Sequence, residues 1–213
     1  MKKYIKLGAL AAIAAAGLSL YSTTANAQTR PRTGIKAGLS ASSLFYDNAN
    51  ATDKKERIGF HAGVFTQLPI GSAFAIQPEL LYINKGASSG YSAIGNTGRN
   101  SFNLNYAELP VLATIKLGNF ADIQAGPYVG YLLSSNVKTE GSLGNVGVNL
   151  NPDQFNRVDY GLAGGVNVYF GQLLIGARYE QGLQKIANTT ASQAVLNNAR
   201  NGVGLLSIGY SFN

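Results

Sequence analysis

The sequence predicts an all-β protein: an eight-stranded antiparallel up-and-down β-barrel that spans a membrane and is preceded by a cleaved signal peptide. Three observations support this prediction. Apolar and polar side chains alternate along one segment after another, which is typical of strands with two different faces. Short and long connections alternate between these segments. Ionisable side chains stay on one face of each segment.

The composition limits both the fold and the chemistry. The chain has 213 residues, of which 46% are hydrophobic and only 13% are charged, which favours one folded domain over long disordered regions or a coiled coil. It contains no cysteine and one histidine, His61. Disulfides, thiol nucleophiles and metal sites that need two imidazoles are therefore excluded.

Residues 1–27 are predicted to be a signal peptide. Three lysines precede an apolar run of about 14 residues, Leu7–Leu20, and Ala25-Asn26-Ala27 fits a cleavage site. The run is shorter than the roughly 20 residues that a membrane-spanning helix needs. Removal of Lys2, Lys3 and Lys6 lowers the formal charge from +7 to +4. Because no dense basic cluster remains, we expect no nucleic-acid partner. Residues 28–32 are predicted to be a short linker, and residues 33–213 the barrel.

Eight segments carry the alternating pattern and are predicted to be strands. The connections after the second, fourth and sixth segments are short, whereas Asp47–Arg57, Gly86–Ser101, Ser134–Arg157 and Gln184–Asn201 are predicted to be long loops. Barrels of outer membranes have short turns at the periplasmic end and long loops outside. The predicted strands are Thr33–Tyr46, Ile58–Leu68, Phe74–Lys85, Phe102–Lys116, Phe120–Leu133, Val158–Phe170, Leu173–Leu183 and Gly202–Phe212.

The apolar face of these strands is predicted to meet outer-membrane lipid. Aromatic residues of this face form two bands, with aliphatic residues between them, as at the two interfaces of a bilayer. The opposite face has too few charges for a water-exposed surface. The band near the short turns contains Phe74, Phe170, Tyr210 and Phe212, and the band near the long loops contains Phe45, Phe60, Tyr82, Tyr131, Tyr160 and Tyr179.

The polar face is predicted to fill the lumen. An eight-stranded barrel is about wide enough for side chains alone, so buried charges need partners there. We therefore interpret the inward residues as a structural polar network and not as a conduction path. Its predicted members are Lys36, His61, Glu79, Glu108, Asp159, Arg178 and Glu180, and the same face also carries Gln77, Lys85, Lys116 and Asp122.

The sequence predicts no catalytic, cofactor-binding or metal-binding residues. His61 is a possible base or ligand, but no nucleophile motif accompanies it, and a hydrogen-bonded interior histidine is the favoured interpretation. No phosphate-binding glycine motif occurs, and Asn151-Pro152-Asp153 has the composition of a turn.

Several segments resemble the PorT-like outer-membrane β-barrel family. QPELLY (residues 77–82) and AELP (residues 107–110) are the most specific, and further similar segments follow in the family's order through most of residues 33–213. The resemblance implies an eight-stranded porin-like barrel in the outer membrane but no particular activity. The terminal Gly-Tyr-Ser-Phe-Asn also resembles the signal that the barrel-assembly machinery reads, so we expect that machinery to be a partner.

The sequence therefore predicts a non-enzymatic integral outer-membrane barrel with a porin-like, structural or surface-interaction role. Two alternatives remain open. One is a soluble secreted eight-stranded barrel that binds an apolar ligand, and the other is a membrane-barrel enzyme that uses His61. The long loops are poor in charge and in large apolar residues, so they indicate no particular surface partner.

Overall fold

The computed structural model describes residues 30–45, 56–93, 96–141, 144–150, 155–185 and 200–212. The predicted signal peptide lies outside these residues. So do most of the two long connections predicted for Asp47–Arg57 and Gln184–Asn201. Within the described residues, no helix is long and apolar enough to cross a membrane.

Nine strands make up the described fold, and all their pairings are antiparallel. Because apolar and polar residues alternate in them, each strand can bury one face and expose the other. The strands are β1 (Arg32–Phe45), β2 (Arg57–Ile70), β3 (Phe74–Ala93), β4 (Asn96–Leu117), β5 (Ala121–Gly141), β6 (Gly144–Leu150), β7 (Val158–Phe170), β8 (Leu173–Gly182) and β9 (Arg200–Ser211).

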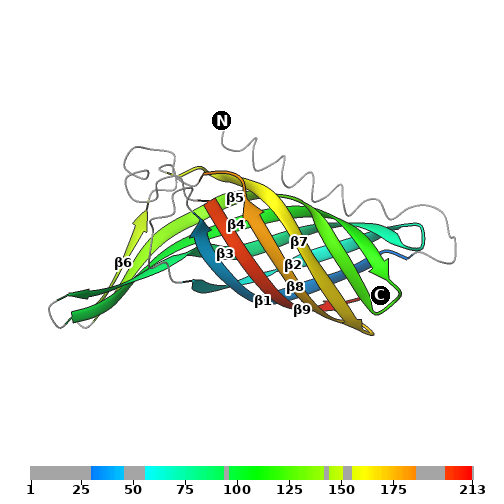
Figure 1. The fold of residues 1–213 in the computed structure, drawn as a ribbon, viewed down its shortest axis with the longest axis horizontal. Helices are drawn as coiled ribbons and strands as arrows, with labels where there is room; N and C mark the ends of the chain where they lie inside the picture. The colour runs from blue at the N-terminus through cyan, green and yellow to red at the C-terminus, as the bar shows by residue number, and fades with distance from the viewer. Residues whose placement is uncertain are drawn as a thin grey trace.

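Eight of these strands close into a barrel, which confirms the predicted fold class (Figure 1). Within this ring, each strand pairs with the next strand in sequence. Because β6 pairs only with β5 and lies outside the ring, the neighbour of β5 in the ring is β7. The barrel closes where β1 pairs with β9, from Gly34 opposite Ser211 to Phe45 opposite Arg200. Closure leaves no unpaired edge in the ring, which a sheet in lipid requires because its backbone groups find no water there.

The three short turns lie at one end of the barrel, as predicted. They follow β2, β4 and β7, and each begins with a glycine of positive φ: Gly71, Gly118 and Gly171. Glycine adopts this backbone conformation at no steric cost, which permits a tight connection. The end of β9 lies at this same end of the barrel, near the label C in Figure 1.

Two of the predicted long loops are wrong, because much of each is strand. The segment predicted as Gly86–Ser101 continues β3 and β4 as a paired hairpin, from Gly86 opposite Asn103 to Ala93 opposite Asn96. In the segment predicted as Ser134–Arg157, β5 continues to Gly141 and β6 pairs with it from Gly144 to Leu150. These strands extend beyond the rim of the barrel (Figure 1). Backbone hydrogen bonds can form such an extension without an apolar pattern, which is why residues 86–101 carry no strand signal.

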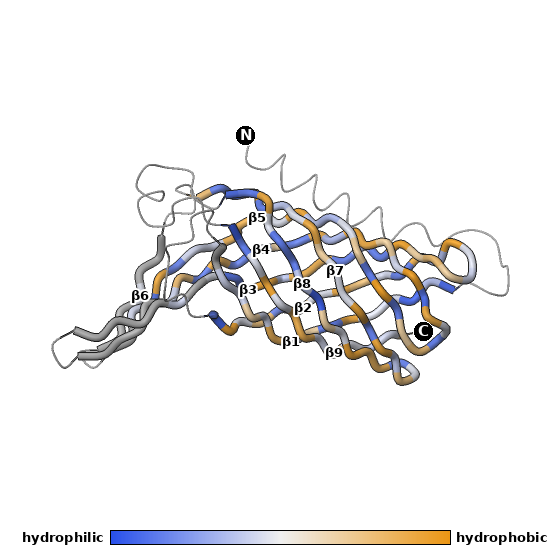
Figure 2. Tube along the Cα trace, in the orientation of Figure 1, coloured by the Kyte–Doolittle hydropathy of each residue, from blue (hydrophilic) through white to orange (hydrophobic). Residues whose placement is uncertain are grey.

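The outward face of the barrel is apolar, as predicted. Hydropathy alternates along the strands in Figure 2, and β7 and β8 alternate between exposed and buried almost without interruption. Leu206 and Ile208 point outward and are 65% and 68% exposed. This arrangement contradicts the soluble alternative, in which these residues would line the interior.

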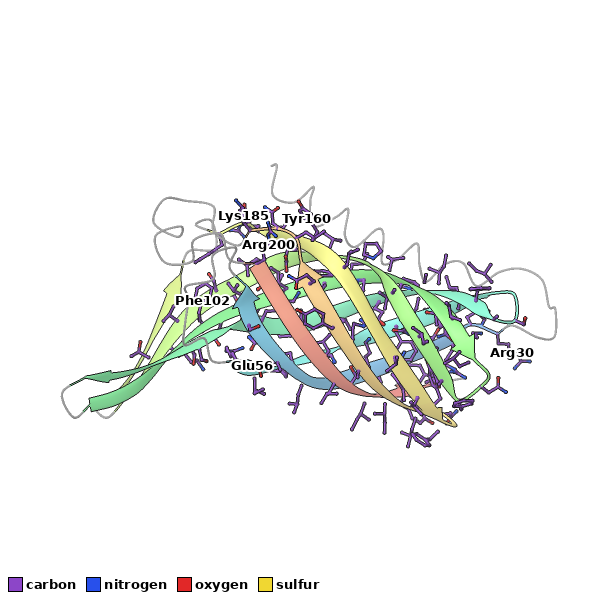
Figure 3. All side chains as sticks on the ribbon, in the orientation of Figure 1. Arg30, Glu56, Phe102, Tyr160, Lys185 and Arg200 are labelled. Atoms are coloured by element: carbon purple, nitrogen blue, oxygen red, sulfur yellow. The ribbon has the colours of Figure 1, made fainter. Side chains whose placement is uncertain are left out.

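The predicted aromatic bands lie on this outward face. The exposed aromatics include Phe74, Phe170, Tyr210 and Phe212 near the short turns, and Phe60, Tyr82, Tyr160 and Tyr179 toward the opposite end. Tyr131 is half-buried, and the side chain of Phe45 lies outside the described part of the structure. Figure 3 shows side chains radiating from the outer surface, with Tyr160 near the end opposite Arg30.

Candidate functional site

All seven residues predicted for the interior network lie inside the barrel and are at most 8% exposed. They come from six strands, and the alternation of side chains in each strand turns them inward. The residues are Lys36 on β1, His61 on β2, Glu79 on β3, Glu108 on β4, Asp159 on β7, and Arg178 and Glu180 on β8.

Glu79 is the centre of one charge cluster. Its carboxylate lies 2.6 Å from Lys36 Nζ and accepts two hydrogen bonds from the Arg178 guanidinium, at 2.7 and 2.8 Å. Such a two-bond pair fixes both the position and the orientation of the carboxylate. Arg178 also donates to the amide oxygen of Gln124, and Gln77 donates to Glu79. The cluster thus joins β1, β3, β5 and β8 across the interior.

Lys85 is the centre of a second cluster and is completely buried. Its Nζ lies 2.6 Å from Glu108, 3.4 Å from Asp159 and 3.5 Å from Glu180. The same atom lies 4.4 Å from the centroid of the Tyr128 ring, where a cation–π contact forms. Three carboxylates that would repel one another are therefore held around one ammonium group.

The two charge clusters are continuous with each other. Arg178 Nη1 lies 4.0 Å from Glu180, which belongs to the cluster around Lys85. Three cations and four carboxylates thus form one network that crosses the lumen. Charges buried in a low-dielectric interior are tolerated only when they are paired and hydrogen-bonded, and most of these are.

A third polar layer lies nearer the short turns and is centred on Asp122. Its carboxylate accepts hydrogen bonds from Gln67 at 2.9 Å, Asn167 at 2.9 Å and the Tyr169 hydroxyl at 2.7 Å. A cavity of about 40 Å³ lies beside it, bordered by Arg32 and Lys116 among others. This volume is enough for one or two water molecules and too small for an organic ligand.

Apolar side chains also fill part of the interior, which the sequence analysis did not predict. Seven residues pack into one cluster toward the end of the barrel that carries the extension. Phe155, just before β7, lies within this cluster and is 4% exposed, and its ring centroid is 5.4 Å from that of Phe102. The members are Ile83, Leu104, Tyr106, Leu132, Phe155, Val203 and Leu205.

His61 forms a hydrogen bond with Ser207 inside the barrel. The distance between His61 Nε2 and Ser207 Oγ is 2.8 Å, and His61 is 1% exposed. A catalytic pair of this kind needs a third group that orients the imidazole and a path for substrate. Among the described residues, Nδ1 of His61 has no hydrogen-bond partner. The pair therefore lacks the orienting group and is shielded from solvent.

The described residues of the interior offer no arrangement suited to a metal ion. In the described part of the chain, no group of three or more histidine, aspartate or glutamate side chains is placed to hold one. Three carboxylates surround Lys85, whose ammonium group occupies their centre. The network of charged and polar side chains can hold the strands together and obstruct the lumen.

Several partners in the network carry no charge, so the segregation of ionisable side chains did not predict them. Gln67, Gln124 and Ser207 share the inward parity of their strands, so the same rule applied to amides and hydroxyls would have found them. Phe155 carries no such signal, because it lies outside the regular strands.

A closed sheet with an apolar outer surface and a charged, filled interior defines the class of membrane-spanning β-barrels. The model of a family described as "Outer membrane protein beta-barrel domain" matches residues 26–188. The chain belongs to this family and is a protein of the outer membrane. The family is therefore known at this level, whereas the more specific PorT-like name rests on the sequence segments alone.

Solved structures similar to this chain include three outer-membrane proteins. One is the attachment invasion locus protein Ail of Yersinia pestis, in complex with the heparin analogue sucrose octasulfate. It shares 13% identity with this chain and has a TM-score of 0.49, and the match covers 86% of this chain and 99% of that chain. Neisserial surface protein A shares 14%, with 84% and 97% covered and a TM-score of 0.48. OprG of Pseudomonas aeruginosa shares 13%, with 87% and 98% covered and a TM-score of 0.38. No curated protein matches the chain.

Proposed function

We propose that this chain is a non-enzymatic outer-membrane barrel of the PorT-like group, with a closed interior and a role at the cell surface. The observation that carries this proposal is the continuous filling of the interior. The Lys85 and Glu79 clusters cross the lumen, and the apolar cluster around Phe155 packs on the side of the extension. An apolar constriction excludes water and ions even where a narrow passage exists.

Conductance across a planar bilayer tests the closed interior. The wild-type barrel is expected to show no discrete conductance steps. Arg178→Ala should lower the free energy of unfolding strongly while it changes conductance little, because Arg178 pairs with Glu79 and Gln124. Regular steps in the wild type, or altered conductance at unchanged stability in Arg178→Ala, would support the narrow-porin alternative instead.

The absence of an enzymatic function is part of the proposal. His61 lies inside the barrel and has Ser207 as its partner, with no carboxylate on its second ring nitrogen among the described residues. His61→Ala is expected to keep the folded electrophoretic mobility of the barrel. A hydrolase activity of the purified protein that His61→Ala abolished, with the fold intact, would refute this part.

The surface role is supported by the extension formed by β3, β4, β5 and β6. Binding functions concentrate on segments that project from a rigid scaffold. We propose that this end of the barrel contacts the surface partner. Replacement of residues 89–100 by an Asn-Gly turn, which keeps Ser88 opposite Ser101, should leave the barrel folded and abolish binding of the surface partner. Retained binding would assign the interaction elsewhere.

The partners proposed for the barrel itself are outer-membrane lipid and the barrel-assembly machinery. The exposed outward side chains Tyr210 and Phe212 support both partners, since Tyr210 lies on β9 and Phe212 directly follows the last residue of this strand. Phe212→Ala is expected to lower the amount of protein assembled in the outer membrane. The measurement is the folded fraction in membrane extracts, with Phe74→Ala as the matched control.

A further inference from the structure

A polar cleft opens on the outer wall of the barrel where β2 and β3 separate. The pairing of β2 with β3 ends at His61 opposite Ile83, whereas β2 continues along β1 to Arg57 opposite Ser42. The cleft has a volume of about 440 Å³, and the ends of β2 and β3 and parts of β4 and β5 border it. This volume lies within the range of small-molecule sites.

Side-chain amides form an ordered ladder along this cleft. Arg57 donates to Asn84, Asn84 donates to Asn105 at 2.5 Å, and Asn105 donates to Ser134 at 2.8 Å. A β-bulge in the pairing of β4 with β5 at this point brings Ser134 opposite Asn105. The ladder holds the polar groups in fixed positions, which reduces the entropic cost of binding a ligand.

A second pair of amides leaves hydrogen-bonding capacity unused. Asn103 donates to Asn136 at 2.7 Å, and both residues border the cleft. Asn103 is only 4% exposed, and its amide oxygen has no hydrogen-bond partner among the described residues. A buried acceptor without a partner is costly, so a ligand hydroxyl that reached this oxygen after a small rotation of the Asn103 side chain would recover the lost bond.

The charge of the cleft is positive. Arg57 and Lys138 border it, and none of the described residues that line it is a carboxylate. Glu56 precedes Arg57 in sequence but does not line the cleft. An arginine can bind a phosphate with two parallel hydrogen bonds, and a nearby lysine adds a second charge. The cleft thus fits an anion that also carries hydroxyl groups.

The level of the cleft along the barrel axis indicates where such an anion would come from. Phe60 and Tyr82 line it, with ring centroids 5.7 Å apart, and both belong to the aromatic band near the long loops. Aromatic bands mark the headgroup level of a bilayer. The cleft therefore opens outward at the level of lipid headgroups and not toward the interior.

We propose that this cleft binds the phosphorylated sugar headgroup of an outer-leaflet glycolipid. Arg57 and Lys138 would hold the phosphate, the amides of Asn103 and Asn136 would bind sugar hydroxyls, and Phe60 and Tyr82 would contact the apolar side of the sugar. This assignment is independent of whether the lumen conducts, because the cleft lies on the outer side of the barrel wall and the lumen on the inner side.

Native mass spectrometry in a neutral detergent tests this proposal with lipid A as the probe, since that lipid is a phosphorylated diglucosamine. The wild-type protein should retain lipid A at least about tenfold more tightly than phosphatidylglycerol or dephosphorylated lipid A. Arg57→Gln and Lys138→Gln should each weaken retention by about tenfold. Lys138 is exposed and has no structural role in the ladder, so its variant remains informative if Arg57→Gln fails to fold.

Lys185→Gln is the matched control, because Lys185 is an exposed cation toward the same end of the barrel but does not line the cleft (Figure 3). It should retain lipid A as the wild type does. Equal retention of phosphatidylglycerol would overturn the proposal, and so would unchanged retention by Lys138→Gln or equal loss in Lys185→Gln. Binding of soluble glucosamine phosphate as tight as that of lipid A would refute the lipid source.

Discussion

The outer surface and the interior of this barrel are built by alternate residues of the same strands, yet they depend on their side chains in different ways. Outward residues such as Leu206 and Ile208 need only be apolar, because their neighbour is fluid lipid. Inward residues such as Glu79 and Lys85 need particular partners at particular distances. Inside the barrel, the substitutions that lower stability most should be those that remove a partner. On the outer surface, they should be those that replace an apolar side chain by a charged one.

The largest effect is expected from Glu79→Ala. It would leave Lys36 and Arg178 buried near each other without their shared carboxylate. The loss of one partner from a buried ion pair costs about 3–5 kcal/mol, so the free energy of unfolding should fall by about this amount. Urea unfolding in lipid vesicles measures it. Glu56→Ala, at an exposed residue of the rim, is the control and should change stability by less than about 0.5 kcal/mol. Equal effects of the two variants would contradict the paired interior.

A charge on the outer surface should have the next largest effect. Leu206→Arg places a cation toward the middle of the lipid-facing wall, which costs about 2–4 kcal/mol in a bilayer. Leu173→Arg, beside a short turn, should cost only about 0–1 kcal/mol because the site is near the interface. The same unfolding measurement in vesicles compares them. A depth-independent cost would argue that lipid does not surround this face.

A smaller effect is expected for a neutral interior bond. Ser207→Ala removes the hydroxyl that bonds His61 Nε2, which should cost about 0.5–1.5 kcal/mol. Ser43→Ala is the control for the loss of a serine hydroxyl as such, since Ser43 is a half-buried serine on β1. A cost for Ser207→Ala as large as that for Glu79→Ala would mean that charge pairing is not what distinguishes the interior.

The alternation made most of the barrel predictable from the sequence. One parity rule placed Lys36, Glu79 and Arg178 on the interior face and Leu206 on the outside, because a strand allows only two directions. The choice between lipid and water on the apolar side followed from the aromatic bands and from the low charge of the other face. These are properties of a single strand, and a single sequence displays them.

Features that depend on partners distant in sequence were not predictable in the same way. Ser207 meets His61 across 146 residues, and the central position of Lys85 depends on the stagger of β3 against β7 and β8. Residues 86–101 and 134–150 were predicted as loops because they are rich in Ser, Asn and Gly, which also compose loops. Inward apolar residues such as Phe65 and Leu104 were not predicted, because the segregation of ionisable side chains marks the polar members of the interior and not the apolar ones.

Spin labelling along β9 tests the orientation of the wall most directly, and the natural chain has no cysteine to interfere. Single cysteines at residues 205–208 and 210 would carry nitroxide labels in a reconstituted bilayer. We expect labels at 206, 208 and 210 to be relaxed by dissolved oxygen, which concentrates in hydrocarbon, and those at 205 and 207 to be protected. High accessibility of 206 and 208 to a water-soluble nickel complex, or an inverted alternation, would contradict the contact of the apolar face with lipid.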